Sequence, residues 1–257
     1  MSKLDDIRQY FFVIRELVTR EIKRKYARSY LGVLWSVLQP LLSMAILSMI
    51  FSTIFQRSIE NFPIYYLTGN IFWSMFTGAT SSAMTALVDN KSLLIKVKLP
   101  MMIFPMARVY TALVNLGYSL IAYACMLIFF KNGFYWTFIF LILIIGCELM
   151  FSIGLGNILA VAYVFFGDIK HLYSVLLTLW MYCSAIFYPV ESLSVTMKQI
   201  VNANPMYGFI ACARKCIMEG QPLTVSEMLK MVLWGGGIFL LGQLIFSANK
   251  SKIMQRL

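Results

Sequence analysis

The sequence predicts an all-α integral membrane protein with six spanning helices. Of its 257 residues, 60% are hydrophobic and only 13% are charged, and the mean hydropathy is +0.76. A water-soluble domain of this length needs far more polar surface to cover its core. Six apolar stretches have about the ~20 residues that cross a bilayer, or more: 31–55, 63–88, 103–130, 134–166, 172–189 and 229–247. The fourth is too long for one upright span, so we expect it to tilt, to project into the cytosol or to bend at Gly154-Leu155-Gly156. We expect residues 1–257 to form a single transmembrane domain.

Residues 1–30 are predicted to form an amphipathic helix that ends in a basic run. Apolar side chains recur there at helical spacing, at Leu4, Ile7, Phe11, Ile14 and Val18. Such a helix lies in the membrane interface or packs its apolar face against a protein surface. The basic run, which includes Arg24, Lys25 and Arg28, stands directly before the first span. A run of this kind binds nucleic acid, contacts anionic lipid, or marks the side of the membrane on which the chain begins.

The distribution of basic residues predicts the orientation of the chain. Eight Lys and Arg residues precede the first span, four lie between the second and third spans, and three follow the last. The first–second and third–fourth loops hold one each, Arg57 and Lys131. Cytoplasmic loops carry the excess of Lys and Arg, so both termini are predicted to lie in the cytoplasm, with the chain crossing the inner (cytoplasmic) cell membrane several times. The first residues, "MSKLDDIRQYFF", lack the pattern of a signal peptide.

Two of the loops contain more apolar residues than an ordinary loop. The first, within "DNKSLLIKVKLP", predicts a short amphipathic helix over 90–99 that combines Lys91, Leu93, Leu94, Ile95, Lys96 and Lys98. Its apolar face either sits on lipid or docks into a groove of a cytoplasmic partner. The second, 191–228, has fewer apolar residues than a span requires, and we expect two short re-entrant helices on the external side, divided near Asn204-Pro205.

Polar groups suited to catalysis are sparse. The chain has no G-x-x-x-x-G-K-[ST], HExxH or GxSxG motif, and its five cysteines have neither metal-site nor disulfide spacing. We therefore predict no catalytic residue, no metal and no ATP site. Glu148 is the only acidic residue deep inside a predicted span, and Asp168 stands at a cytoplasmic end. A carboxyl group at such depth is structural, paired or protonated, or it takes part in conformational coupling.

Aromatic residues are numerous, with 20 Phe, 14 Tyr and 5 Trp. The segment "LWMYCSAIFYP" brings together four of them, Trp180, Tyr182, Phe187 and Tyr188. A secondary set comprises Trp73, Phe76 and Tyr207. These side chains form an interfacial belt, or they line a path along which the apolar faces of sugar rings slide.

Four motifs, in this order, extend over essentially the whole chain. They are "KYARSYLGVLWSVLQPL" (Lys25–Leu41), "LIKVKLP" (Leu94–Pro100), "FGDIKHLYSVLLTLWMYCSAIFYP" (Phe166–Pro189) and "NPMYGFIACARKCIMEG" (Asn204–Gly220). Together they resemble the permease subunits of type 2 ABC exporters that move lipid-linked polysaccharides, such as O-antigen, capsule, teichoic acid and rhamnose-polysaccharide exporters. Many relatives have an arginine before the aspartate that corresponds to Asp168, where this chain has Gly167.

The resemblance implies a transporter subunit that is not itself an enzyme. Two copies of the chain would pair with two copies of an ATP-binding ABC subunit, which binds ATP and Mg, so that no cofactor belongs to this chain. The first and fifth spans of a homodimer would line the channel, with the aromatic side chains of Trp35, Trp180, Tyr182, Phe187 and Tyr188. Residues 90–99 would dock onto the ATPase, while Arg24, Lys25 and Arg28 would meet the diphosphate of a lipid-linked polysaccharide. Membrane lipids are further partners, and nucleic acid is not expected.

Three other functions remain open. The chain could be the permease of a drug or lipid ABC exporter within the same superfamily. It could be an intramembrane enzyme that acts on lipid-linked sugars, although the sequence offers no polar catalytic set. The third is an ion-coupled carrier in which Glu148 is the coupling group.

Overall fold

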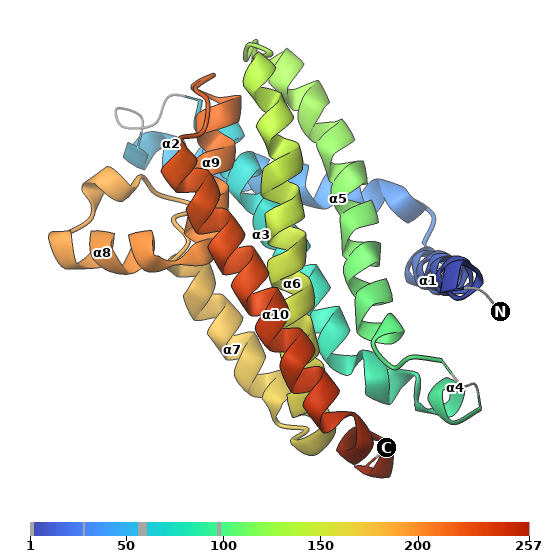
Figure 1. Cartoon of the computed structure of the whole chain (residues 1–257). Coiled ribbons are helices and arrows are strands. Elements are labelled where there is room, and N and C mark those ends of the chain that lie inside the picture. The colour runs from blue at the N-terminus through green and yellow to red at the C-terminus, as the bar shows by residue number, and fades with distance from the viewer. Residues whose placement is uncertain (1–2, 28, 56–60, 97–98, 257) are drawn as a thin grey trace.

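The computed structural model describes residues 3–27, 29–55, 61–96 and 99–256, and every regular element in these ranges is helical. The α-helices are α1 (Lys3–Tyr26), α2 (Trp35–Phe55), α3 (Phe62–Asp89), α4 (Lys91–Lys96), α5 (Ile103–Phe129), α6 (Phe140–Phe165), α7 (Ile169–Tyr182), α8 (Val195–Ala203), α9 (Pro205–Ile217) and α10 (Val225–Arg256) (Figure 1). Short 3-10 turns are η1 (Gly32–Leu34), η2 (Trp136–Ile139) and η3 (Val190–Ser192).

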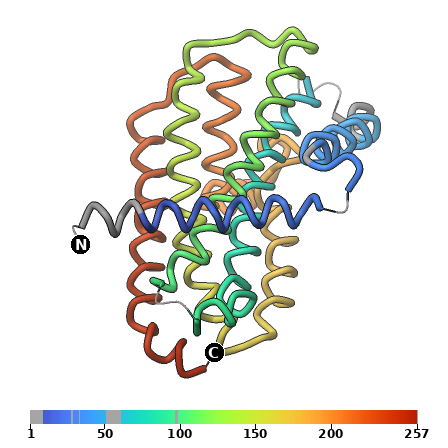
Figure 2. The backbone as a smooth tube through the Cα atoms, turned by 90° about the vertical axis from the view of Figure 1, so that its right-hand side faces the viewer, coloured from blue at the N-terminus to red at the C-terminus, as the bar shows by residue number. Residues whose placement is uncertain are grey.

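Helices α3, α5, α6 and α10 run side by side and form the body of a bundle (Figures 1 and 2). The α4 helix and the C-terminus lie at one end, here called the α4 end, and the connection between α5 and η2 lies at the opposite end. Hydroxyl groups tie α3 to its neighbours: Tyr123 and Thr68 share a hydrogen bond of 2.5 Å, and Tyr173 donates one of 2.6 Å to Thr80. Such bonds between helices in an apolar environment contribute about 1 kcal/mol each.

The α6 and α10 helices approach each other through glycines. A Cβ atom on Gly242 would lie 2.2 Å from the Gly154 carbonyl oxygen, and one on Gly235 would lie 2.6 Å from the Cys147 carbonyl oxygen. Only residues without a side chain allow two helix backbones to come this close. The sequence suggested a bend at Gly154-Leu155-Gly156; instead, Gly154 is a contact point for α10 and Gly156 faces Ala83 of α3.

The first two helices cross the bundle rather than join it. Figure 2 shows α1 running across the other helices, and α2, seen nearly end-on in that view, also runs across them in Figure 1. In α1, Ile14, Leu17 and Val18 pack into an apolar cluster shared with α3, α4, α5 and α10, whereas Phe11 and Phe12 are exposed. Part of the apolar face of this helix therefore packs against the protein, and part is exposed in a way that suits contact with lipid. Both alternatives predicted from the sequence are compatible with this arrangement.

The all-helical fold is confirmed, but six separate spans are not. Among the described residues, three helical segments are long and apolar enough to cross a membrane: Ile103–Phe129, Trp136–Phe165 and Val225–Arg256. The α3 helix has sufficient length, with 28 residues, but its many polar residues lower its hydropathy. The α7 helix ends at Tyr182, seven residues before the predicted end, and its 14 residues reach only about 21 Å of a ~30 Å apolar layer.

The segment after α7 divides where the sequence predicts. The α8 helix ends at Ala203 and α9 begins at Pro205, since the Asn204 side chain accepts a hydrogen bond of 2.9 Å from the Met206 N–H and so caps α9. Proline at the first helical position has no N–H that needs a partner. With 13 residues, α9 is too short to span a bilayer.

Candidate functional site

Three helices carry polar residues at a spacing of three or four, and these stripes line one cavity of about 780 Å³. The stripes are Ser36, Gln39 and Ser43 on α2, Asn70, Ser74 and Thr77 on α3, and Thr111, Asn115 and Ser119 on α5; Ser82 of α3 also lines the cavity. This spacing places each set on one face of its helix. Polar groups on bilayer-crossing helices are costly unless they meet polar partners, so the cavity suits a polar ligand or water. We call it the polar groove.

A proline helps to fix α2 over this groove. Pro40 lies inside α2 and has no N–H to donate to the Ser36 carbonyl one turn earlier. The Ser119 hydroxyl of α5 donates a hydrogen bond of 3.3 Å to that carbonyl. From the other side, the Tyr26 hydroxyl at the end of α1 donates to the Asn115 side-chain oxygen at 3.4 Å. The groove is therefore framed by α1 and α2, and α3 and α5 form its wall.

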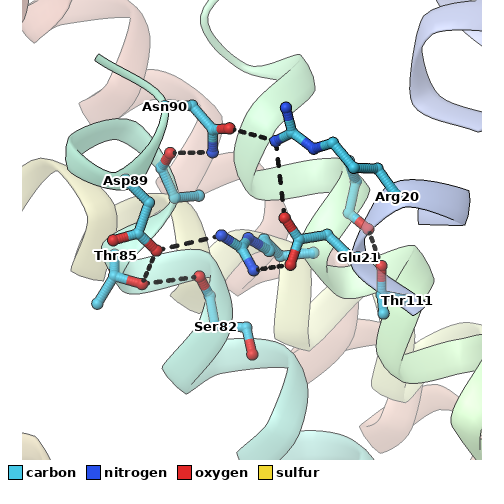
Figure 3. Close-up of polar contacts among 10 residues, drawn as sticks. Arg20, Glu21, Ser82, Thr85, Asp89, Asn90 and Thr111 are labelled. Carbon is cyan, nitrogen blue, oxygen red and sulfur yellow. Dashed lines mark hydrogen bonds and ion pairs between the residues drawn. The ribbon is translucent and has the colours of Figure 1, made fainter. Parts of the chain in front are cut away.

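A charged cluster closes the groove toward the α4 end (Figure 3). Arg108 of α5 contacts two carboxylates, Glu21 of α1 and, at 3.1 Å, Asp89 of α3. The Thr85 hydroxyl donates a further hydrogen bond of 2.8 Å to Asp89. The side chains of Glu21 and Arg108 are mostly buried, so both charges need opposite charges nearby. Each has a second one, since Glu21 also lies 3.7 Å from Arg20 and Arg108 also contacts Asp89.

A second contact in the same cluster joins α1 to the start of α4. The Arg20 guanidinium donates a hydrogen bond of 2.6 Å to the Asn90 side-chain oxygen (Figure 3). Asn90 is the residue between α3 and α4, and its amide nitrogen donates to the Ala86 carbonyl at 2.8 Å. The two links together make α1 and the end of α3 one polar junction.

Two of the three basic residues predicted at the substrate entrance lie at the edge of the groove. Arg24 and Lys25 are exposed and line it, and neither has a carboxylate partner among the described residues. Arg28 lies outside the described residues. The two exposed cations suit the anionic group of a ligand, and the neutral hydroxyl and amide groups of the polar groove suit a polar, uncharged part joined to it.

The predicted docking helix exists, but it is shorter than expected and its apolar face is divided. Residues Lys91–Lys96 are helical, Asn90 and Leu99 are not, and 97–98 lie outside the described residues. Leu94 is buried in the cluster formed with Leu17 and Leu87, because α1 and α3 lie beside α4, so the expectation of an apolar face without contacts in the chain is wrong for this residue. Exposed side chains are Lys91, Ile95 (65%) and Lys96; Leu93 is half-buried, and Lys98 lies outside the described residues.

The predicted channel aromatics do not form one surface. Trp35 and Tyr182 are exposed, and Phe187 stacks on Tyr66 with ring centroids 5.8 Å apart. Trp180 points inward: it packs against Phe76 and Phe151 and donates a hydrogen bond of 2.7 Å to Asn204. The Tyr188 hydroxyl donates to the Tyr182 carbonyl.

The three residues of the secondary aromatic set, Trp73, Phe76 and Tyr207, do not lie in one site either. Trp73 and Phe76 are buried core residues, which argues against direct contact with a ligand. Tyr207, on α9, lines a different cavity at the opposite end of the bundle.

The two acidic residues singled out in the sequence differ in environment. Glu148 is 0% exposed, and its carboxyl oxygens have no hydrogen-bond partner among the described residues; Ser152 and Asn157 of the same helix share this property. Asp168 is exposed, directly before α7, and its side chain makes no capping bond there. The Glu148 carboxyl lies apart from the polar groove, which it does not line.

Sequence inspection missed the polar stripes and Arg108 as site residues. The signal was present, because polar residues recur every three or four positions in otherwise apolar helices, for example at Asn70, Ser74 and Thr77. That three such faces meet in one cavity depends on how the helices cross, which the spacing does not specify.

Comparisons with known proteins identify the family of this chain. Residues 13–218 match the family described as ABC-2 type transporter. An O-antigen export system permease protein RfbA from Myxococcus xanthus is 28% identical over 89% of this chain and 90% of its own length. A protein of the same name from Klebsiella pneumoniae is 25% identical over 96% and 95% of the two chains. The polysialic acid transport protein KpsM of Escherichia coli is 26% identical over 80% and 81%. Because the family match covers most of its length, this chain belongs to the ABC-2 type transporter family.

Proposed function

We propose that this chain is the permease subunit of an ABC transporter that exports a lipid-linked polysaccharide. The observation that carries the proposal is the polar groove with Arg24 and Lys25 at its edge, in a chain whose relatives are named for O-antigen export and polysialic acid transport. A polysaccharide offers hydroxyl groups, which exchange hydrogen bonds with Ser, Thr, Asn and Gln side chains. A diphosphate linker offers the negative charge that the basic pair attracts.

The proposed source of energy is a separate ATP-binding subunit. It would dock at the α4 end, where Ile95 and the flanking lysines are exposed. Its closure on ATP would move α4, and the Arg20–Asn90 contact would carry this movement into α1 at the groove. In this proposal the α4 end and both termini face the cytoplasm, where the ATP is, and the membrane is the cytoplasmic membrane.

The proposed assembly contains two copies of the chain. The α7 helix presents an apolar face that its own bundle leaves exposed, formed by Leu172, Val175, Leu176, Leu179 and Tyr182. On α2, Leu42 and Ile46 are exposed in the same way. An apolar strip on each of these two helices suits contact with a second copy, with the path for the glycan between the two copies. Teichoic acid and other glycans share the required chemistry with O-antigen.

Deletion of the gene in its own strain, with complementation, tests the function. Loss of a surface glycan together with accumulation of the lipid-linked glycan inside the cell is expected, and the intact chain should restore export. Unchanged surface glycan with altered resistance to a drug would instead indicate a drug or lipid exporter. Export that continues without ATP but stops when the proton gradient is abolished would indicate an ion-coupled carrier.

A further inference from the structure

A second cavity, of about 580 Å³, lies at the end of the bundle opposite α4. It is built by the start of α3, the connection between α5 and η2, the turn η3, and α9. Three tyrosines from three different segments line it: Tyr65, Tyr135 and Tyr207.

The floor of this cavity contains a buried arginine. Arg214 is only 6% exposed and donates hydrogen bonds to three backbone carbonyls, those of Tyr65 (3.3 Å), Ala185 (2.9 Å) and Ile186 (3.2 Å). Its guanidinium carbon lies 3.4 Å from the centre of the Tyr65 ring. Burial lowers the pKa of Arg214 to about 10, so the group stays charged at neutral pH.

The chain makes space for this arginine. A Cβ atom on Gly69 would lie 2.7 Å from the Arg214 guanidinium, so a larger residue there would displace it. A guanidinium has five N–H donors, and three of them are used by carbonyls among the described residues. Arg214 lines the cavity, and its guanidinium has two further N–H donors.

The charged residues that line the cavity have a net charge of zero. Lys131 and Arg214 contribute two positive charges, and Glu191 and Glu219 contribute two negative charges. Asn61 adds a neutral amide. An anion would be repelled by the carboxylates about as strongly as it is attracted by the cations. The lining therefore favours an uncharged ligand that accepts and donates many hydrogen bonds.

One of the rings lies on glycine. Tyr135 is 40% exposed, and a Cβ atom on Gly220 would come within 2.7 Å of its ring. Gly220 also has a positive φ of 64°, which a residue with a side chain rarely adopts. A Cβ atom on Gly133 would lie 3.0 Å from the same ring. Glycine at both positions thus leaves room for the ring of Tyr135 close to the backbone, in the lining of the cavity.

We propose that this cavity binds a neutral sugar unit, with a ring face of the sugar on Tyr135 and its hydroxyl groups on Arg214 and the carboxylates. The C–H groups of a sugar face are attracted to the negative face of an aromatic ring, and its hydroxyl groups suit planar charged side chains. The proposal rests on the function proposed above, because it makes the exported glycan the source of the sugar. The cavity then holds the leading sugar on the side to which the glycan is delivered.

The test uses the full chain in nanodiscs and saturation-transfer difference NMR. The probe is a mixture of neutral oligosaccharides of one to three repeats, released by mild acid from the envelope glycans of the strain that carries the gene. Saturation transfer to sugar C–H protons is expected. Tyr135→Ala should weaken binding about five- to tenfold, and Tyr135→Phe should retain it. Trp136→Ala is the matched control, since Trp136 is an exposed neighbour that packs on Phe140 and does not line the cavity.

Three outcomes overturn the proposal: no transfer to any oligosaccharide, equal loss in Trp136→Ala and Tyr135→Ala, or preferential binding of inorganic phosphate used as a second probe. Because Tyr135→Phe keeps the ring, its retained binding separates stacking from a general loss of fold. Glycan export, measured in the same variants in cells, is a separate readout. An intact chain that exports glycan but binds no sugar contradicts only this site, whereas an intact chain that binds sugar but does not restore export to the deletion strain contradicts the function proposed above.

Discussion

Arg20 of α1 donates a hydrogen bond of 2.6 Å to Asn90, the residue that separates α3 from α4. The Asn90 amide is held in turn by the Ala86 carbonyl, so its position depends on the last turn of α3. A movement of α4 can therefore reach α1 through this hydrogen bond, in addition to the apolar cluster that Leu94 shares with Leu17. The groove begins at the next residue of α1, since Glu21 lines it.

Removal of this contact is expected to uncouple ATP use from transport. Arg20→Ala and Asn90→Ala should each lower glycan-stimulated ATP turnover by the reconstituted transporter, with normal insertion. If the two residues act as a pair, the double variant should be no worse than either single variant. Arg15→Ala removes an exposed cation from the same helix and is the control. Effects that simply add in the double variant would contradict a shared role.

The Arg108 cluster is expected to contribute to stability. Arg108→Ala leaves the mostly buried Glu21 with only the more distant Arg20, 3.7 Å away, as a cation. The free energy of unfolding should fall by roughly 1–2 kcal/mol, less than for a fully buried pair because Arg20 remains and Asp89 is partly exposed. A lower melting temperature in detergent is the measurement. Addition of Glu21→Gln to Arg108→Ala should recover part of the loss, because the carboxylate that lost its partner is then replaced by a neutral amide. A double variant no more stable than Arg108→Ala alone would show that attraction between these charges is not the cause.

Close contact between α6 and α10 predicts a steric effect. Gly242→Val places a side chain where the Gly154 carbonyl oxygen lies 2.2 Å from an added Cβ, so the helices must separate at a cost of about 2–3 kcal/mol. Gly237 has no atom within 4 Å of an added Cβ, and Gly237→Ala should be neutral or stabilising by about 0.5–1 kcal/mol. Melting temperatures of the two variants give the comparison. Equal effects in the two variants would mean that the close contact between α6 and α10 does not decide stability.

The sequence predicted the helical class, the break at Asn204-Pro205 and a short helix near residue 94, because hydrophobicity, proline and helical spacing are local signals. It did not predict that α2 crosses the bundle, that Leu94 is buried, or that Trp180 points into the core. These depend on which helix faces meet, and periodicity identifies a face without identifying its neighbour. The two cavities were missed for the same reason, since each combines residues from three or more segments.

The α4 helix offers a test in which docking and folding are separable. Ile95→Asp changes an exposed side chain, so the chain should fold while its ATPase partner no longer responds to substrate. Leu94→Asp places a charge in a buried apolar cluster and should reduce the amount of folded protein. Co-purification of the ATPase and its turnover measure the first effect, and gel filtration measures the second. A normal ATPase response in Ile95→Asp would place the docking surface elsewhere.

Filling the polar groove is expected to stop export without unfolding the chain. Ser74 is an exposed residue of the α3 stripe, so Ser74→Leu adds apolar bulk to the cavity without disturbing the core. Export of the glycan should fall about tenfold, since a few added methyl groups in a binding site have effects of this size. Ser247→Leu makes the same change at an exposed position of α10 outside the groove and should leave export unchanged. Surface glycan is measured in cells with equal amounts of each variant. Normal export in Ser74→Leu would exclude the groove as part of the substrate path, because a polar head group cannot share that space with a leucine side chain.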